Sequence, residues 1–167
     1  MEQMQFERQD LKKIADFIDQ AHLVLTEDAV MEIYHHRGVE NFKNIGAVFI
    51  KIINCEYCKS YVIMLPGQTY PNHFHKIKTE TFFVLLGQLD VTCEGEVHSL
   101  HPGEILSVER GQSHSFSSIN GAVFEELSTT YIKNDSVYSD SIIRNSVYEQ
   151  RKTLIPIGKF KEMIVDE

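Results

Sequence analysis

The alternation of apolar and polar residues changes character near residue 40. Before that point, one stretch has apolar residues at the three-and-four spacing typical of an amphipathic helix. These residues are Leu11, Ile14, Ala15 and Ile18. A second short helix is expected from Thr26, a suitable N-cap, to Gly38, a suitable stop, with Val30, Ile33 and Tyr34 on its apolar face. We therefore expect residues 1–40 to form a helical prefix.

The pattern from residue 47 to residue 130 is that of short strands. Runs rich in Val, Ile, Phe and Thr alternate with turn signals such as Pro66-Gly67, Pro102-Gly103 and Asn120-Gly121. Many short strands at such spacing are typical of an all-β sandwich or barrel. We expect one domain, with a β-barrel over residues 41–133, the helical prefix packed on it, and a C-terminal extension over 134–167 that holds a short helix near residues 141–148.

Composition and charge narrow the class of protein. A chain of 167 residues with 16 Lys and Arg and 24 Asp and Glu carries a formal charge of −8. This acidic balance argues against nucleic acid and anionic membrane surfaces as partners, since no basic stripe could neutralise phosphates. The polar start of the chain does not resemble a signal peptide, so we expect a cytoplasmic protein. Its three cysteines, Cys55, Cys58 and Cys93, are interpreted as structural thiols, because Cys55-x2-Cys58 has no second pair to complete a zinc site.

Candidate chemistry is concentrated in one stretch after Gly67. His73 and His75 are two residues apart, so on a strand both imidazoles project from the same face. Glu80 has the opposite parity, and its carboxylate can join them only if the chain turns near Ile77. Further along, His114 begins another strand-like run. These four side chains are our candidate ligands for one metal ion.

Three imidazoles and one carboxylate suit a borderline divalent ion, with Mn²⁺ as our first choice and Zn²⁺, Fe²⁺ or Co²⁺ as alternatives. In an octahedral shell, such a set leaves two positions for substrate oxygens. Five other histidines lie outside this set, and we expect them at the surface or at helix ends. These are His22, His35, His36, His98 and His101.

The spacing of the candidate ligands resembles the cupin superfamily. The first cupin motif, G-x5-H-x-H-x4-E-x6-G, is matched at every defined position from Gly67 to Gly87. The second motif, G-x5-P-x-G-x2-H-x3-N, is matched at Gly103, Gly111 and His114, with Glu109 in place of the usual Pro and Ser118 in place of the usual Asn. The departures do not affect a metal ligand. The resemblance implies a small double-sheet jelly roll with the metal inside its mouth.

The flanking stretches resemble the D-lyxose isomerase family of cupins. The similar stretches are residues 23–30, 57–59, 65–69, 78–82, 121–123 and 126–128. The likeness covers residues 23–143, without the longer insertions that these isomerases carry after the first His pair and before the second motif. Residues 125–130, 134–136 and 151–153 also resemble the cupin module of sialic-acid-synthase-like proteins. Both resemblances imply sugar metabolism.

Two further residues are candidates for moving protons on a sugar. Glu125 and Glu126 face opposite sides of a strand, so only one can point inward, and periodicity alone does not choose between them. The isomerase resemblance selects Glu126 as the base. Lys78 lies two residues before Glu80, hence on the same face if that stretch is extended. We expect a metal nearby to lower the pKa of Lys78, which would suit an acid or electrostatic role.

The sequence thus favours a metal-dependent sugar ketol-isomerase of the D-lyxose/D-xylulose or D-mannose/D-fructose type. An ion that binds two adjacent sugar oxygens makes the C2 proton more acidic, and a carboxylate then moves that proton. One alternative is a non-catalytic sugar-binding or regulatory cupin in nonulosonic acid or surface carbohydrate biosynthesis. An iron dioxygenase is the third reading, since three His and one Glu also suit oxygen chemistry. By analogy with other cupins we expect a homodimer.

Overall fold

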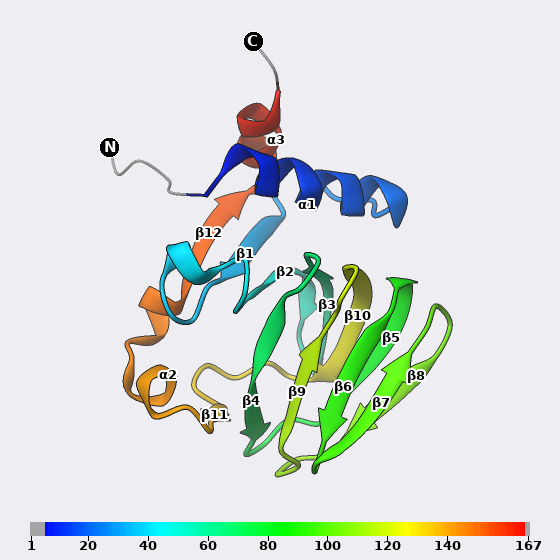
Figure 1. Ribbon diagram of the computed structural model, residues 1–167, viewed down its shortest axis with the longest axis vertical. Helices are drawn as coiled ribbons and strands as arrows, with labels where there is room; N and C mark the ends of the chain where they lie inside the picture. The colour runs from blue at the N-terminus through cyan, green and yellow to red at the C-terminus, as the bar shows by residue number, and fades with distance from the viewer. Residues whose placement is uncertain (1–5, 166–167) are drawn as a thin grey trace.

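The computed structural model describes residues 6–165 and arranges the strands in two antiparallel sheets that face each other (Figure 1). The larger sheet has seven strands in the order β12-β1-β2-β3-β10-β5-β8, and the smaller sheet has five in the order β11-β4-β9-β6-β7. The expected all-β jelly roll is confirmed. No helix within residues 6–165 is long and apolar enough to cross a membrane.

The larger sheet is built from β1 (Val30–Tyr34), β2 (Ala47–Asn54), β3 (Tyr57–Met64), β5 (Glu80–Gly87), β8 (Ile105–Val108), β10 (Ala122–Thr129) and β12 (Lys152–Pro156). The smaller sheet is built from β4 (Thr69–His75), β6 (Leu89–Cys93), β7 (Glu96–Leu100), β9 (His114–Ser117) and β11 (Ser136–Tyr138). The described helices are α1 (Arg8–Gln20), α2 (Ser141–Asn145) and α3 (Ile157–Ile164), with 3-10 turns η1 (Val39–Asn41) and η2 (Tyr148–Arg151).

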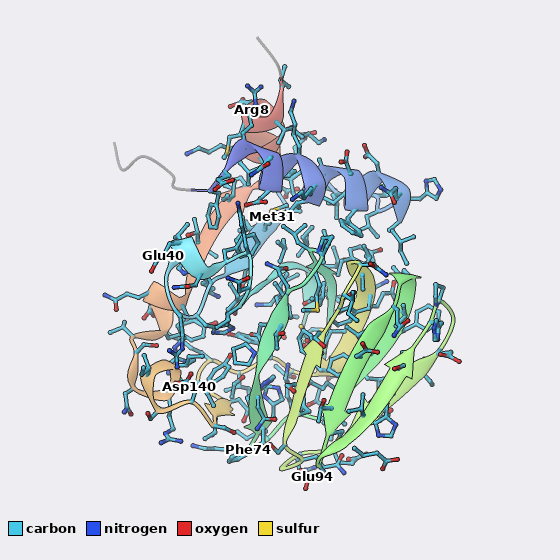
Figure 2. All side chains as sticks on the ribbon, in the orientation of Figure 1. Arg8, Met31, Glu40, Phe74, Glu94 and Asp140 are labelled. Atoms are coloured by element: carbon cyan, nitrogen blue, oxygen red, sulfur yellow. The ribbon has the colours of Figure 1, made fainter. Side chains whose placement is uncertain are left out.

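The main core lies between the two sheets, where side chains fill the interior (Figure 2). Strand β5 shows how the sequence builds it, because its residues alternate between the two faces of the sheet. Phe82 and Val84 point inward and are fully buried, on the same face as Glu80, while Phe83 is only half-buried on the other face. This alternation places a carboxylate and two apolar side chains on one inner surface, as the sequence predicts.

A second core lies between the outer face of the larger sheet and two helices. Leu11 and Ile14 of α1 and Phe160 of α3 are buried there. They pack with sheet residues such as Met31, which is labelled beneath α1 in Figure 2. The predicted amphipathic helix is therefore confirmed as α1, and its apolar stripe covers part of the sheet.

The second predicted helix, between Thr26 and Gly38, is wrong. This stretch contains β1, which pairs with β2 on one side and with β12 on the other. The spacing of Val30, Ile33 and Tyr34 imitates a helical face, but pairing on both sides of the strand favours an extended chain. Only the single turn η1 follows it.

The C-terminal extension contributes to both sheets. The short helix expected near residues 141–148 is present as α2, capped by the Asp140 carboxylate, which accepts hydrogen bonds from the backbone N–H groups of Ile142 and Ile143. The extension also supplies β11, which extends the smaller sheet beside β4, and β12, which extends the larger sheet beside β1. Strands β1, β11 and β12 all lie outside residues 41–133.

Candidate metal centre

Four side chains converge inside the barrel, and they are the four ligands predicted from the sequence. His73 and His75 come from β4, Glu80 from the start of β5, and His114 from the start of β9. All four are buried, and one ligand atom from each lies within 4.8 Å of the others. The pairing of His73 with His114 across β4 and β9 brings the two cupin motifs together. A bend at residues 76–77 lets Glu80 rejoin the two histidines, as its parity requires.

Hydrogen bonds at the rear of two imidazoles fix which nitrogen faces the centre. The Nδ1 atom of His73 lies 2.8 Å from the carbonyl oxygen of Pro71, and that of His114 lies 3.0 Å from the carbonyl of Gln112. Because a carbonyl oxygen can only accept, each Nδ1 carries the proton and donates it. Each Nε2 then presents its lone pair inward, as a metal ligand must.

The third imidazole is held by residues that the sequence analysis did not assign to the site. His75 Nδ1 lies 3.3 Å from Ser136 Oγ and 3.5 Å from Asp135 Oδ2. The buried Asp135 carboxylate also accepts hydrogen bonds from the backbone N–H groups of Ile77 and Lys78, at 2.9 and 3.1 Å. Asp135 therefore fixes both the ring of His75 and the bend before Glu80. Asp135 is 57 residues from Lys78 in the sequence, so no local sequence pattern predicts this role.

The inward-facing atoms fit a divalent metal ion. The Nε2 atoms of His75 and His114 are buried without a hydrogen bond of good geometry, although they lie 3.3 and 2.6 Å from Glu80 Oε1. Buried polar atoms of this kind are costly unless something satisfies them. Three imidazole nitrogens and one carboxylate oxygen are ligands that Mn²⁺, Fe²⁺, Co²⁺ and Zn²⁺ accept. The cluster can therefore hold a metal ion.

The electrostatics of the cluster favour the metal-binding form of His73 and Glu80 and act in the opposite direction on His114. Burial, reinforced by the two neighbouring imidazoles, holds the pKa of His73 well below its ordinary value. Burial alone would raise the pKa of Glu80, but the Lys78 ammonium and the adjacent imidazoles outweigh it and hold that pKa well below its ordinary value. Burial also opposes a charge on His114, yet the Glu80 carboxylate beside it raises its pKa.

The two candidate catalytic residues lie against this cluster. Lys78 Nζ is 2.8 Å from Glu80 Oε2 and 2.8 Å from Glu126 Oε1, and all three side chains are buried. The expectation that a nearby metal lowers the pKa of Lys78 stays a prediction, and the two carboxylates act in the opposite direction. Burial would lower that pKa, but the two carboxylates outweigh burial and raise it. Lys78 is thus a charged donor bridging two acidic groups.

The structure also separates the two neighbouring glutamates of β10. Glu126 is buried and lines the interior cavity, as the isomerase resemblance implies. Glu125 points to the other face of the sheet, where its carboxylate lies 2.7 Å from Lys59 Nζ. One strand therefore carries two carboxylates with lysine partners, one inside the barrel and one outside.

A single pocket joins the metal cluster to the Lys78–Glu126 pair. The space between its lining atoms, including the part open to solvent, is about 720 Å³. His73, His75, Lys78 and Glu126 line it. Cys58 lines it too; it is buried, and, like Cys55 and Cys93, it is a free thiol.

Two histidines outside the cluster are not where the sequence analysis expected them. His35 and His36 are buried at the end of β1 and are not surface residues. His36 lies among aromatic rings, with its ring centroid 4.7 Å from that of Tyr70 and 5.1 Å from that of Tyr138. Burial, with smaller contributions from Arg151 and His35, lowers its pKa to about 3. His36 is therefore a neutral core residue.

Comparison with known proteins agrees with this architecture. Residues 60–125 match the cupin domain family. The chain is 33% identical over 81 residues to the quercetin 2,3-dioxygenase of Bacillus subtilis, a match that covers 48% of this chain and 22% of that protein. It is 23% identical over 163 residues to the D-lyxose/D-mannose isomerase of Thermosediminibacter oceani, covering 80% of this chain and 90% of that protein.

Solved structures share the fold over most of the chain. The L-ribose isomerase of Cellulomonas parahominis superposes with a TM-score of 0.66 at 15% identity, covering 83% of this chain and 93% of that one. The L-ribose isomerase of Geodermatophilus obscurus gives a TM-score of 0.64 at 14% identity, covering 80% and 90%. Residues 60–125 thus match the cupin domain family, and over most of its length the chain is similar to a D-lyxose/D-mannose isomerase.

Proposed function

We propose that this protein is a metal-dependent aldose–ketose isomerase acting on a small free sugar, of the D-lyxose/D-xylulose or D-mannose/D-fructose type. The observation that carries the proposal is the position of Glu126 and Lys78, which line the same pocket as His73 and His75. Lys78 contacts both Glu126 and the candidate ligand Glu80. A site that only binds metal has no need of a second buried carboxylate beside a buried lysine. The similarity to a D-lyxose/D-mannose isomerase supports the same reaction class.

His73, His75, Glu80 and His114 would hold the metal, and Mn²⁺ is our first choice for it. When bound, a divalent ion acidifies the proton on the carbon next to a carbonyl and stabilises the negative charge that develops on oxygen. The three imidazoles are held by Pro71, Gln112, Asp135 and Ser136. The ligand set is thus fixed in position before a substrate arrives.

Glu126 would move the proton between the two carbons. Its carboxylate would take the proton from C2 of the open-chain aldose as the C1–C2 double bond forms, and would return it to C1 as the C2 carbonyl forms. The second hydrogen moves between oxygens, so aldose and ketose have the same atoms and no oxidant or reductant is needed. Lys78 donates a hydrogen bond to Glu126 Oε1 and so fixes the direction of the carboxylate.

Lys78 would also stabilise charge on the substrate. Its ammonium group has three donors, and two of them face Glu80 and Glu126. The third remains for a sugar oxygen on which negative charge develops during proton transfer. A preorganised cation in a buried pocket stabilises such charge more than water does.

The test compares the two glutamates of β10. We expect Glu126→Gln to lower kcat at least about 100-fold while Mn²⁺ affinity stays unchanged, because loss of a general base costs roughly 10²–10⁴-fold. Glu125→Gln is the matched control, since it makes the same chemical change one residue away on the outer face. We expect it to retain near wild-type turnover. Full turnover by Glu126→Gln would remove Glu126 from the mechanism.

One comparison favours a second candidate, oxygen chemistry at an iron centre. The stretch that resembles a quercetin 2,3-dioxygenase covers 48% of this chain. Fe²⁺-dependent oxygen uptake with an added organic substrate, and no sugar isomerisation, would favour this candidate. A non-catalytic sugar-binding module would instead bind saccharides without any exchange of hydrogen with solvent.

A further inference from the structure

The pocket has a second group of polar side chains away from the metal ligands. We call it the tyrosine end and define it by Tyr34, Tyr131 and Tyr148, which all line the pocket. The hydroxyl of Tyr148 contacts that of Tyr131 and lies 3.3 Å from that of Tyr34. The proposed isomerisation uses none of these groups. Tyr34 is buried, and Tyr131 and Tyr148 are partly buried, so their hydroxyls need hydrogen-bond partners.

A partly buried ion pair holds the tyrosine end in place. Lys152 Nζ lies 2.6 Å from Glu32 Oε2, 2.9 Å from the Tyr148 hydroxyl and 3.3 Å from the Tyr34 hydroxyl. All three donors of its ammonium are therefore used. Tyr34 in turn donates to Glu32 at 3.1 Å. Burial would raise the pKa of Tyr148, but its hydrogen bonds with Lys152, Tyr131 and Tyr34 lower it.

The charges at this end favour a neutral ligand over a phosphate. Glu32 is paired with Lys152 and, through its other oxygen, with Lys51 at 3.4 Å. Lys51 Nζ also lies 3.9 Å from the centre of the Tyr131 ring. Binding a phosphate dianion calls for several free cationic donors, and here the donors of Lys152 are used and Lys51 shares Glu32. Phenolic hydroxyls, which both donate and accept, match the hydroxyl groups of a polyol.

The strand order separates the tyrosine end from the catalytic pair. Tyr34 is on β1 and Glu126 on β10, with β2 and β3 between them in the larger sheet. Three strand spacings amount to roughly 14 Å between the two backbones, a gap that the side chains from both ends partly fill. A sugar with its reacting carbons at Glu126 would extend its remaining carbons along the pocket toward Tyr34 and Tyr148.

The residues of this end come from parts of the chain outside the cupin domain match. Glu32 and Tyr34 precede residues 60–125, while Tyr131, Tyr148 and Lys152 follow them. The metal ligands, Lys78 and the rest of the first motif lie inside that match. The metal ligands and the tyrosine end therefore come from different segments of the chain.

We propose that the tyrosine end is a subsite for the hydroxyl groups of a neutral sugar at the end remote from the reacting carbons, with Tyr148 as its specificity-determining residue. The inference rests on the proposed function in one respect, since it takes the substrate to be a sugar bound with C1 and C2 at Glu126. Lys152 and Glu32 act through Tyr148 and Tyr34, which they hold in position.

The test pairs a variant that lacks one hydroxyl with a substrate that lacks one hydroxyl. Tyr148→Phe removes only the phenolic oxygen, and Tyr57→Phe, at a position 54% exposed on β3, is the matched control. Both variants and the wild type are loaded with Mn²⁺ and assayed with D-mannose and 6-deoxy-D-mannose, and with D-lyxose and 5-deoxy-D-lyxose. Metal affinity, sugar Kd, KM and kcat are measured for each combination.

We expect Tyr148→Phe to raise KM for the complete sugars about 10-fold with kcat changed less than about 3-fold, the effect of one lost hydrogen bond. With the wild type, the KM of each deoxy sugar should be about 10-fold above that of the complete sugar. With Tyr148→Phe, the KM of the deoxy sugar should not rise further, so the two sugars of a pair should have equal KM values. Metal affinity should be the same in both proteins. Equal increases in KM for both sugars of a pair, or a result indistinguishable from that of Tyr57→Phe, would overturn the proposal of a subsite.

The same data separate this inference from the proposed function. If the wild type binds the sugars without converting them, the isomerase proposal fails, and the Kd values for the same four combinations test the subsite. If turnover is normal but Tyr148→Phe does not distinguish the sugars, only the subsite fails. If the wild type neither binds nor converts any of the four sugars, both are overturned.

Discussion

The buried contact of Lys78 with two carboxylates makes a quantitative prediction about stability. Lys78→Met replaces the ammonium by an apolar group of similar length and leaves Glu80 and Glu126 facing each other without a cation. Each contact is 2.8 Å long, so at an effective dielectric constant of about 20 each contributes about 6 kcal/mol before desolvation is counted. Desolvation of three ionised groups offsets most of this, and breaking such a buried pair costs about 3–5 kcal/mol.

An independent route gives a similar magnitude. The least costly response of the variant is to protonate one of the two carboxyls. For a carboxyl of ordinary pKa 4.5, taking up a proton at pH 7 costs about 1.36 kcal/mol per pH unit, hence about 3.4 kcal/mol. We therefore expect the free energy of unfolding of Lys78→Met to fall by about 3–5 kcal/mol.

The matched control is Lys59→Met on the outer face. Lys59 Nζ lies 2.7 Å from Glu125 Oε1, almost the same distance, but the two side chains are 29% and 17% exposed. Such a solvent-accessible pair contributes about 1 kcal/mol or less. The two variants thus compare one ion-pair geometry in two environments.

The assay is urea unfolding at pH 7 in EDTA, followed by far-UV circular dichroism, because the chain has no Trp. The double variant Lys78→Met/Glu126→Gln should recover part of the stability, since it removes one of the unpaired carboxylates. Equal losses for Lys78→Met and Lys59→Met, or no recovery in the double variant, would show that the stability does not depend on a buried cation between Glu80 and Glu126.

Three further predictions follow from single contacts. His36 binds no proton in the folded state until pH falls to about 3, whereas unfolded histidine binds one below about 6.5. The free energy of unfolding therefore falls as pH drops through this window. In denaturant titrations with EDTA, His36→Phe should reduce the slope of that free energy against pH by up to about 1.36 kcal/mol per pH unit. Mn²⁺ at 100 times its Kd should add about 2.7 kcal/mol to the free energy of unfolding, and His75→Ala should abolish that gain in thermal melts. Gly87→Ala, which would place a Cβ 2.2 Å from the carbonyl oxygen of Gly121, should cost more in chemical denaturation than Gly95→Ala, which has a similar positive φ and open space around it.

The metal cluster could be predicted from the sequence because the spacings that specify it lie within short segments of the chain. His73 and His75 share a face by strand periodicity, and the return of Glu80 needs only one bend. The same alternation predicts the inner face of β5. His114 required the second motif, whose strand β9 then pairs directly with β4.

What the sequence could not show depends on contacts between distant segments. The stretch around Ile33 has apolar spacing that suits a helix, and it becomes a strand because β2 and β12 pair with it. Asp135 reaches the metal cluster, and Tyr148 reaches the pocket, only because the C-terminal extension folds back along both sheets. For Lys78, the sequence did not show that Glu126 lies beside it as well as Glu80, and the two carboxylates together raise its pKa.

The most direct test of the central claim is proton NMR of the Mn²⁺-reconstituted protein's reaction with D-lyxose and D-mannose in D₂O, with the ion removed before spectra are recorded. We expect signals of the corresponding ketose and deuterium at C2 of the recovered aldose, both absent without metal and both lost in Glu126→Gln. Bound sugar and bound metal with no ketose and no deuterium at C2 would contradict the proposed isomerisation.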